Sequence, residues 1–376
     1  MSSLCRLCKH DLTGHSVVTL APFPSAAQYF PAPDEFDQDR GIALEVMQCP
    51  MCALVQLANS PVTYYREVIT AASLSPVARQ TRLGEFKRFV EEFDLAGSNA
   101  IEIGSGKGDM IGVLRDAGLK AVGLEYSEES VAFARANGHE AYCGYVEDVA
   151  LPDQYRFFAC LNYLEHQPDI SSFIRALYRI TDDQSIGYIT VPNLDYLLTN
   201  AYLYEFVADH LVYFTRQTLT RAFELHGFEV LRCTLINNQN DIALLVKKRR
   251  PLVIKEERCE VDLLCKHLRK TIADIHIHGS KVAVWGAGHR TLALLAISEI
   301  RDIEFVVDSA SFKQGKYTPL THFKIVSPSQ LEASDVDTVI VMVPGIYPEE
   351  VVKSVKNMNR PIHILMQKGN SILEAV

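Results

Sequence analysis

The feature that most constrains this chain is an apolar segment that runs directly into alternating glycines. The segment covers 99–103, and the glycines that follow it are Gly104, Gly106 and Gly108. A strand that turns through glycines into a helix brings main-chain N–H groups close to a ligand, where a Cβ would block the approach. A dinucleotide-binding fingerprint fits poorly because it requires glycine where Asp109 stands, and no Gly-Lys-Ser/Thr follows as in a Walker loop.

Two acidic residues accompany this turn. Glu102 lies in the apolar segment, and Glu125 ends the next apolar run, about twenty residues further on, where such folds place a carboxylate on ribose hydroxyls. The pattern Glu-x-Gly-x-Gly-x-Gly resembles the first motif of class I S-adenosylmethionine (SAM) methyltransferases. The resemblance implies that Glu102, Gly104, Gly106 and Glu125 contact the cofactor. A tight strand-to-helix turn without a ligand is the alternative.

Length and charge bound the possible architectures and partners. A chain of 376 residues exceeds one ordinary core and suggests two or three domains. Its formal net charge of −9 argues against a nucleic-acid partner bound through a basic surface. No apolar stretch approaches the roughly 18 residues that span a bilayer, so no membrane association is expected. We expect a cytoplasmic protein, because nothing resembles a secretory signal.

Two CxxC pairs lie in the first part of the chain, Cys5 with Cys8 and Cys49 with Cys52. In a reducing location the nine cysteines are not expected to form a disulfide framework. Two knuckles that each offer two thiolates can bring four sulfurs into a tetrahedron, which is how structural Zn²⁺ is held. The intervening segment is polar and proline-rich, so a metal would supply the missing folding energy. A redox CxxC is the rival interpretation.

Strand-like and helix-like patterns alternate after these cysteines. Strands are predicted at 99–103, 120–124, 140–143, 157–161, 186–191, 228–233 and 241–247. One or two helices are predicted within 73–93, and further helices at 110–117, 128–136, 171–180 and 216–226. This alternation predicts an α/β fold with a mostly parallel Rossmann-like sheet and helices on both faces. Ligands are then expected beyond the carboxyl ends of the strands.

A second unit of similar pattern is predicted after a charged connector. A strand enters the turn Gly286-Ala287-Gly288, another ends in Asp308, and a third covers 338–343. The pattern predicts a smaller Rossmann-like domain, in which the glycine turn is either structural or a ligand contact. The chain is therefore divided into a zinc module (1–65), a SAM-type domain (66–250) and a C-terminal Rossmann-like domain (251–376).

Polar side chains follow several of the predicted strands. Asp148 comes after the third strand, where methyltransferase folds present a carboxylate to adenine, although Asp also caps helices and turns. Asn162 ends the next strand and leads into Leu164-Glu165-His166. These residues are expected at the rim of the sheet as cofactor or substrate contacts, with a capping role as the alternative.

Asp209 and His210 form the most specific candidate for a catalytic pair in the sequence. A histidine takes up a proton near neutral pH, and a neighbouring carboxylate raises its basicity. On a helix the two side chains would point about 100° apart, so a direct contact requires an irregular backbone. The alternative is a histidine satisfied at the rim of the fold.

The order of these features resembles the bacterial sugar C-methyltransferase family, which acts on deoxysugars attached to nucleoside diphosphates. The run Phe312-Lys313-Gln314-Gly315-Lys316-Tyr317-Thr318-Pro319 looks like that family's C-terminal signature. The resemblance implies deprotonation next to a 4-keto group and methyl transfer from SAM to that carbon. It also implies a C-terminal domain that covers the cleft and holds part of the nucleotide sugar.

The resemblance assigns His210 as general base and Asp209 as the residue that orients it. The family tyrosine position is occupied here by Val207, and Tyr204 or Tyr213 is a candidate substitute, with Tyr213 chosen for enolate or substrate contact. This departure leaves O- or N-methylation of a related sugar open, as well as a non-catalytic binding protein. A monomer and a dimer both remain possible.

Overall fold

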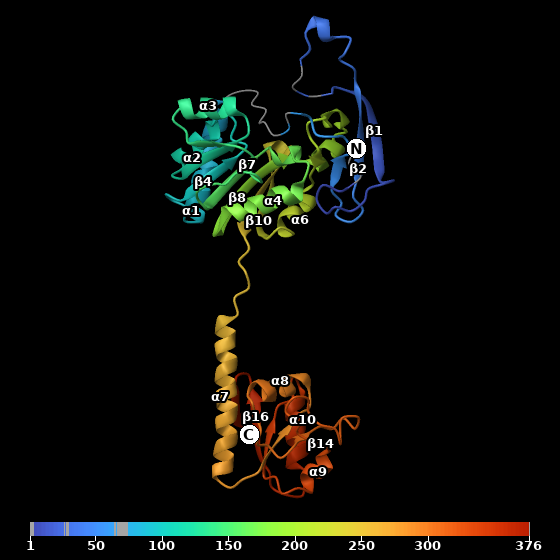
Figure 1. The fold of residues 1–376 in the computed structure, drawn as a ribbon, viewed down its shortest axis with the longest axis vertical. Coiled ribbons are helices and arrows are strands. Elements are labelled where there is room, and N and C mark those ends of the chain that lie inside the picture. Colours follow the sequence, from blue (N-terminus) through green and yellow to red (C-terminus); the bar gives the residue numbers. More distant parts are fainter. Residues whose placement is uncertain (1–3, 26, 28–29, 64, 66–73, 376) are drawn as a thin grey trace. The chain divides into compact units, whose positions relative to one another are not determined.

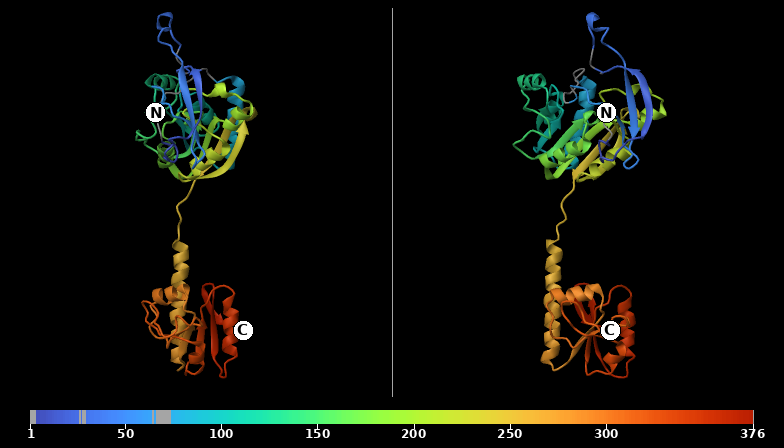
Figure 2. Two further views of the ribbon diagram at one scale, coloured as in Figure 1. Left: turned by 90° about the vertical axis from the view of Figure 1, so that its right-hand side faces the viewer. Right: turned by 45° about the vertical axis from the view of Figure 1, so that its right-hand side comes forward.

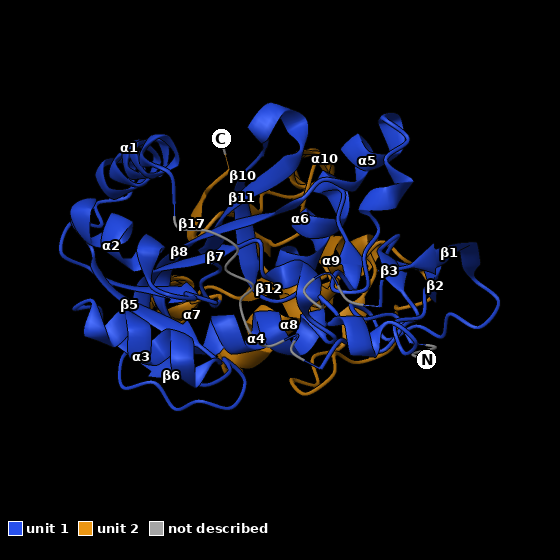
Figure 3. Cartoon of the chain, turned by 90° about the horizontal axis from the view of Figure 1, so that it is seen from above, with its two compact units in different colours: residues 1–251 blue, residues 252–376 orange. Residues whose placement is uncertain are grey.

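A computed structural model describes residues 4–25, 27, 30–63, 65 and 74–375. The chain forms two compact units, 1–251 and 252–376 (Figure 3). The cysteine-containing region 1–65 lies in the first unit together with the sheet that carries the glycine turn. No helix in the described part of the chain combines the length and apolar character needed to cross a membrane.

Unit 1 is built on a seven-stranded sheet of order β10-β11-β8-β7-β4-β5-β6. Its strands are β4 (Asn99–Ile103), β5 (Lys120–Glu125), β6 (Ala141–Cys143), β7 (Tyr155–Leu161), β8 (Thr181–Pro192), β10 (Phe228–Ile236) and β11 (Asp241–Lys248). The five strands from β6 to β8 are parallel, and β11 and β10 are antiparallel. The strand order reverses between β4 and β7, which is where ligands bind in sheets of this kind. The predicted α/β fold is confirmed.

Helices cover both faces of this sheet (Figure 1). They are α1 (Pro76–Glu92), α2 (Asp109–Asp116), α3 (Glu128–Ala136), α4 (Ile170–Ile180) and α6 (Arg216–Glu224). Two consecutive residues of β7 show that helices pack on both faces of the sheet. Phe157 packs in the cluster with α1 and α2, whereas Phe158 packs in the cluster with α4 and α6. Successive side chains of a strand point to opposite faces of the sheet. The continuous apolar run in β7 therefore fits a strand that is buried on both faces.

The N-terminal region forms a second, four-stranded sheet of order β1-β2-β3-β9. Its strands are β1 (Ser16–Phe23), β2 (Ile42–Gln48), β3 (Val55–Leu57) and β9 (Val212–Tyr213), and η1 (Pro33–Glu35) lies between β1 and β2. Figure 2 shows the antiparallel β1–β2 pair beside the larger sheet. Strand β9 pairs with β3 but belongs to the segment directly after His210. The N-terminal sheet therefore includes the chain that follows the candidate base.

Short elements connect the main ones in unit 1. They are η2 (Leu164–His166), α5 (Leu194–Thr199), η3 (Leu203–Glu205) and η4 (Asn237–Gln239). Asp209 and His210 lie in a non-helical loop between η3 and β9. The backbone is thus irregular at this pair.

Unit 2 begins with the long helix α7 (Lys255–Ile277) and contains a six-stranded sheet of order β14-β13-β12-β15-β16-β17. The strands are β12 (Val282–Trp285), β13 (Val306–Val307), β14 (Ile325–Val326), β15 (Thr338–Val341), β16 (His363–Lys368) and β17 (Ser371–Glu374). The remaining helices are α8 (His289–Ile297), α9 (Pro328–Glu332) and α10 (Tyr347–Lys356). All pairings are parallel except β16 with β17, which gives the Rossmann-like unit that the pattern predicted.

Candidate active site

The glycine turn after β4 is fixed by the acid at the end of β5. Gly104, Gly106 and Gly108 all have positive φ angles, of 73°, 50° and 91°, which a side chain would strain. The N–H of Gly106 donates to Glu125 Oε2 at 2.9 Å, and the N–H of Ser127 donates to Glu125 Oε1 at 2.9 Å. The carboxylate of Glu125 therefore joins the ends of two neighbouring strands.

Two buried oxygens beside this turn have no hydrogen-bond partner among the described residues, Glu102 Oε2 and Ser105 Oγ. Burial raises the pKa of Glu102 well above its usual value, and the charges of Glu125 and Asp109 act in the same direction. A ligand that carries positive charge and hydrogen-bond donors would satisfy these groups. SAM, with its sulfonium, its ammonium group and its ribose hydroxyls, fits this set of residues.

Asp148 lies after β6, and Asn162 lies directly after β7. Asp148 is exposed in the turn after β6, and its N–H donates to the carbonyl oxygen of Tyr145 at 2.9 Å. Asn162 follows β7 with a φ of 49°, and its Oδ1 accepts the Thr190 hydroxyl at 2.6 Å. Strand β7 lies directly beside β4, which leads into the glycine turn, whereas β6 is separated from β4 by β5. Their contact with the cofactor stays a prediction.

A second polar cluster joins Glu165 and His166 of η2 to His210 of the loop before β9. The N–H of Leu211 donates to the carbonyl oxygen of Glu165 at 2.8 Å, which holds the two segments together. His166 Nδ1 lies 2.9 Å from the carbonyl oxygen of Asp209. The rings of His166 and His210 meet edge to face, with centroids 4.9 Å apart. Leu-Glu-His was the sequence signal for this cluster, but its pairing with His210 was not predicted.

The protonation of the two histidines follows from this geometry. A carbonyl oxygen only accepts a hydrogen bond, so His166 Nδ1 carries the proton and Nε2 has the lone pair. Burial lowers the pKa of His166, although the hydrogen bond and charge of Asp209 oppose the shift. Burial, together with the neighbouring His166, lowers the pKa of His210 to about 3. The His210 imidazole is therefore neutral near pH 7 and able to accept a proton.

Glu165 and Asp209 supply the carboxyl groups nearest these rings. Burial raises the pKa of Glu165 to about 8. The Asp209 carboxylate is buried, its Oδ2 accepts the N–H of Ala27 at 2.7 Å, and its charge acts on His166. In the described residues we find no hydrogen bond between the side chains of Asp209 and His210, so the orienting role of Asp209 stays a prediction.

The two candidate tyrosines are placed very differently. Tyr204 is 65% exposed, whereas Tyr213 is buried with its ring against Phe206. The Tyr213 hydroxyl accepts the N–H of Val207 at 2.9 Å and donates to the Val207 carbonyl oxygen at 3.3 Å. Tyr213 thus holds the main chain at Val207, the position of the family tyrosine. Its contact with the substrate stays a prediction.

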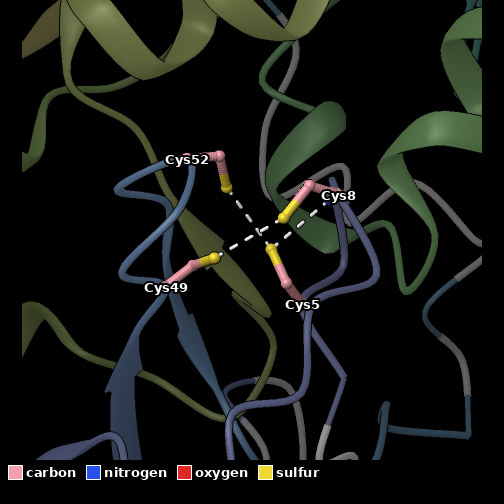
Figure 4. A group of neighbouring side chains, drawn as sticks. All are labelled: Cys5, Cys8, Cys49 and Cys52. Atoms are coloured by element: carbon pink, nitrogen blue, oxygen red, sulfur yellow. Dashed lines mark hydrogen bonds between the residues drawn. The ribbon is translucent and has the colours of Figure 1, made fainter.

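The four cysteines of the two CxxC pairs come together, as the spacing predicted (Figure 4). The Sγ atoms of Cys5 and Cys52 lie 3.5 Å apart, as do those of Cys8 and Cys49. A tetrahedral zinc ion with Zn–S bonds of about 2.3 Å holds its sulfurs about 3.8 Å apart, so the donor set fits this metal. A hydrogen bond from Cys52 lowers the pKa of the Cys5 thiol to about 5, so a thiolate is readily available.

The cysteine cluster also contacts the segments that carry the candidate active site. Arg6, beside Cys5, donates to the carbonyl oxygen of Pro168 at 3.2 Å, shortly after His166. The carbonyl oxygen of Cys52 accepts a hydrogen bond from Arg221 of α6 at 3.1 Å. Together with the β3–β9 pairing, these contacts connect the segments that carry the cysteines to the loop before β9.

Both parts of the chain are similar to methyltransferases. Residues 78–232 match the family described as methyltransferase domain, and residues 255–362 match the C-methyltransferase C-terminal domain. C-methyltransferase NovU of Streptomyces niveus is 25% identical over 94% of this chain and 92% of its own length. A ubiquinone biosynthesis O-methyltransferase of Pseudomonas savastanoi pv. phaseolicola is 34% identical over 24% of this chain and 42% of its own. A solved Pyrococcus horikoshii protein matches with a TM-score of 0.42 and 13% identity, over 50% of this chain and 100% of its own.

Proposed function

We propose that this chain, a SAM-dependent methyltransferase that also matches the C-methyltransferase C-terminal domain, methylates a carbon of a nucleotide-linked deoxysugar. The similarity to NovU extends over nearly the whole chain and supports carbon as the acceptor. The sugar nucleotide is inferred from the resemblance of the motifs and domain order. SAM supplies an electrophilic methyl group on a sulfonium.

The observation that carries the proposal is the half-buried imidazole of His210, which lies edge to face against His166 in the loop before β9. His210 takes a proton from the carbon next to a 4-keto group, and the electron pair of the C–H bond moves toward the keto oxygen. The carbon then bonds to the methyl group as the S–CH₃ bond breaks and its electron pair stays on sulfur. A keto group makes the neighbouring C–H acidic, so a base of modest strength suffices when the enolate is stabilised.

The remaining residues receive roles around this step. Glu102, Gly104, Gly106, Glu125, Asp148 and Asn162 hold the cofactor. Asp209 orients the base, and Tyr213 contributes to the acceptor site. The four clustered cysteines hold a structural Zn²⁺ in a module at 1–65. Residues 66–250 perform methyl transfer, and 251–376 bind part of the nucleotide sugar, in a cytoplasmic pathway of deoxysugar synthesis.

The test is NMR of 4-keto-6-deoxy sugar nucleotides in D₂O with wild type, His210→Asn and the control His267→Asn, a change at an exposed position of α7. We expect wild type and the control to exchange the C3 proton and, with SAM, to produce a C-methyl signal. His210→Asn should do neither. A methyl group on oxygen or nitrogen without exchange would favour the alternative of O- or N-methylation of a related sugar.

A further inference from the structure

We propose that Glu165, His166 and His210 bind a divalent cation of the Zn²⁺ or Co²⁺ type, and that the bound ion blocks proton abstraction by His210. The binding site stands on the geometry alone. Its inhibitory effect rests on the proposed function of His210 as base.

The three side chains offer a compact set of ligand atoms. One ligand atom from each residue lies within 4.8 Å of the other two. A tetrahedral ion with bonds of about 2.0–2.1 Å holds its ligands about 3.3 Å apart, so small side-chain rotations close the set. Two imidazoles and a carboxylate suit zinc-like ions, and the fourth position stays open to water or a ligand.

Glu165 supplies the observation that points to a cation. Its side chain is 2% exposed, and its Oε2 has no hydrogen-bond partner among the described residues. A buried polar oxygen without a hydrogen-bond partner is costly, and a metal ion is one partner that satisfies it. A carboxylate oxygen of the same residue belongs to the compact set with the two imidazoles.

His166 is already oriented as a metal ligand. Its Nδ1–H donates to the Asp209 carbonyl oxygen, so Nε2 presents its lone pair. Histidines that bind metals use their other ring nitrogen in the same manner. The hydrogen bond from Leu211 to the Glu165 carbonyl oxygen fixes the loop with His210 against η2. The site is therefore preorganised by main-chain hydrogen bonds.

The consequence for catalysis follows from the electron pair. An imidazole nitrogen that gives its lone pair to a metal cannot accept a proton with the same pair. A cation bound by Glu165, His166 and His210 would therefore prevent His210 from accepting a proton. This effect differs from that of the metal proposed for the cysteine cluster, which would have only sulfur ligands in the N-terminal region.

Co²⁺ titration tests the site without a substrate. The cysteine cluster is first filled with one equivalent of Zn²⁺, and Co²⁺ is then followed by its visible d–d absorption. Wild type and the control His267→Asn should bind one further Co²⁺ without a sulfur-to-cobalt charge-transfer band. Glu165→Gln and His166→Asn, checked for folding by circular dichroism, should bind about 10–100-fold more weakly. Equal affinity in all four proteins would overturn the site.

Proton exchange tests the consequence. Co²⁺ beyond the first metal equivalent should stop C3 exchange in wild type, and its removal by gel filtration should restore it. Glu165→Gln should retain exchange at Co²⁺ concentrations that silence wild type. Stimulation by Co²⁺ would overturn the inhibitory role. Absence of exchange in metal-depleted wild type would refute the base, while the spectroscopic titration would still decide the site.

Discussion

His166 Nδ1 lies 2.9 Å from the main-chain carbonyl oxygen of Asp209, the residue directly before His210. This contact, with the hydrogen bond from Leu211 to Glu165, joins η2 at the end of β7 to the loop before β9. Hydrogen bonds to main-chain carbonyl groups therefore hold the loop that carries the candidate base. The stability of this loop should matter for catalysis as much as the side chains themselves.

Tyr213→Phe should weaken the loop without touching the cofactor turn. The change removes the partner of the Val207 N–H, which costs about 1–3 kcal/mol when a buried donor loses its acceptor. We expect a lower kcat with unchanged SAM affinity, measured by steady-state kinetics and calorimetric titration. Tyr204→Phe is the matched control because Tyr204 is exposed. Loss of activity in the control alone would show that Tyr204 is the functional tyrosine.

Cys8→Ser should release the metal proposed for the cysteine cluster and disturb the candidate site. Four sulfurs gathered by two distant knuckles cannot be held closely without compensation of their charge, so unit 1 should lose about 4 kcal/mol or more. We expect one metal equivalent less by elemental analysis and a lower melting temperature for unit 1. C3 exchange should also fall, because β3 pairs with β9.

Cys259→Ser provides the control for this experiment, since Cys259 is exposed on α7 in the other unit. It should leave the metal content and exchange unchanged. Full exchange by metal-free Cys8→Ser would separate the cysteine cluster from the active site.

Glu102→Gln should stabilise the protein without SAM and abolish its response to SAM. The folded-state pKa of Glu102 is raised above the unfolded value near 4.5, so its contribution to stability is present below about pH 4.5 and is lost as pH rises. The variant should therefore be more stable than wild type only above that pH, by on the order of 1 kcal/mol. Circular dichroism melts at several pH values, with and without SAM, measure both effects. A SAM-dependent rise in melting temperature that survives the change would remove Glu102 from the cofactor site.

Asp308→Asn should destabilise unit 2. Although burial opposes the shift, hydrogen bonds from Ala310, Lys313 and Ala287 hold the pKa of Asp308 below its usual value of 3.8. The stability that Asp308 contributes is therefore present above about pH 3.8 and is lost as pH falls through the lower folded-state pKa. We expect a loss of about 1–3 kcal/mol at neutral pH, and a smaller difference from wild type at acidic pH.

Urea unfolding followed by tryptophan fluorescence measures this difference in the intact chain. Trp285 is the single tryptophan of the sequence and is buried in β12, so the signal reports on unit 2. Asp262→Asn, at an exposed position of α7, is the control. An equal midpoint for wild type and Asp308→Asn at neutral pH would contradict the prediction.

The sequence by itself determined the strands of the main sheet, the glycine turn after β4 and the two CxxC pairs. The predicted strand at 99–103 coincides with β4, and the strand predicted at 120–124 lies within β5. Such elements are predictable because apolar periodicity and glycine turns are local properties of the chain. The CxxC spacing likewise indicated the cysteine cluster, since each knuckle is a local turn.

Only the tertiary structure decided which distant segments meet. The four-stranded N-terminal sheet was not predicted, and β9 joins it through a pairing of two residues that carries no periodic signal. The segment of Glu165 and His166 meets the segment of His210 through the main-chain hydrogen bond from Leu211 to Glu165, which any residue type could make, and through the hydrogen bond between His166 Nδ1 and the carbonyl oxygen of Asp209. The Tyr213 hydroxyl accepts the N–H of Val207, a contact within the loop that no periodic pattern announces. Local patterns specify elements, but hydrogen bonds and packing between segments far apart in the sequence specify the site.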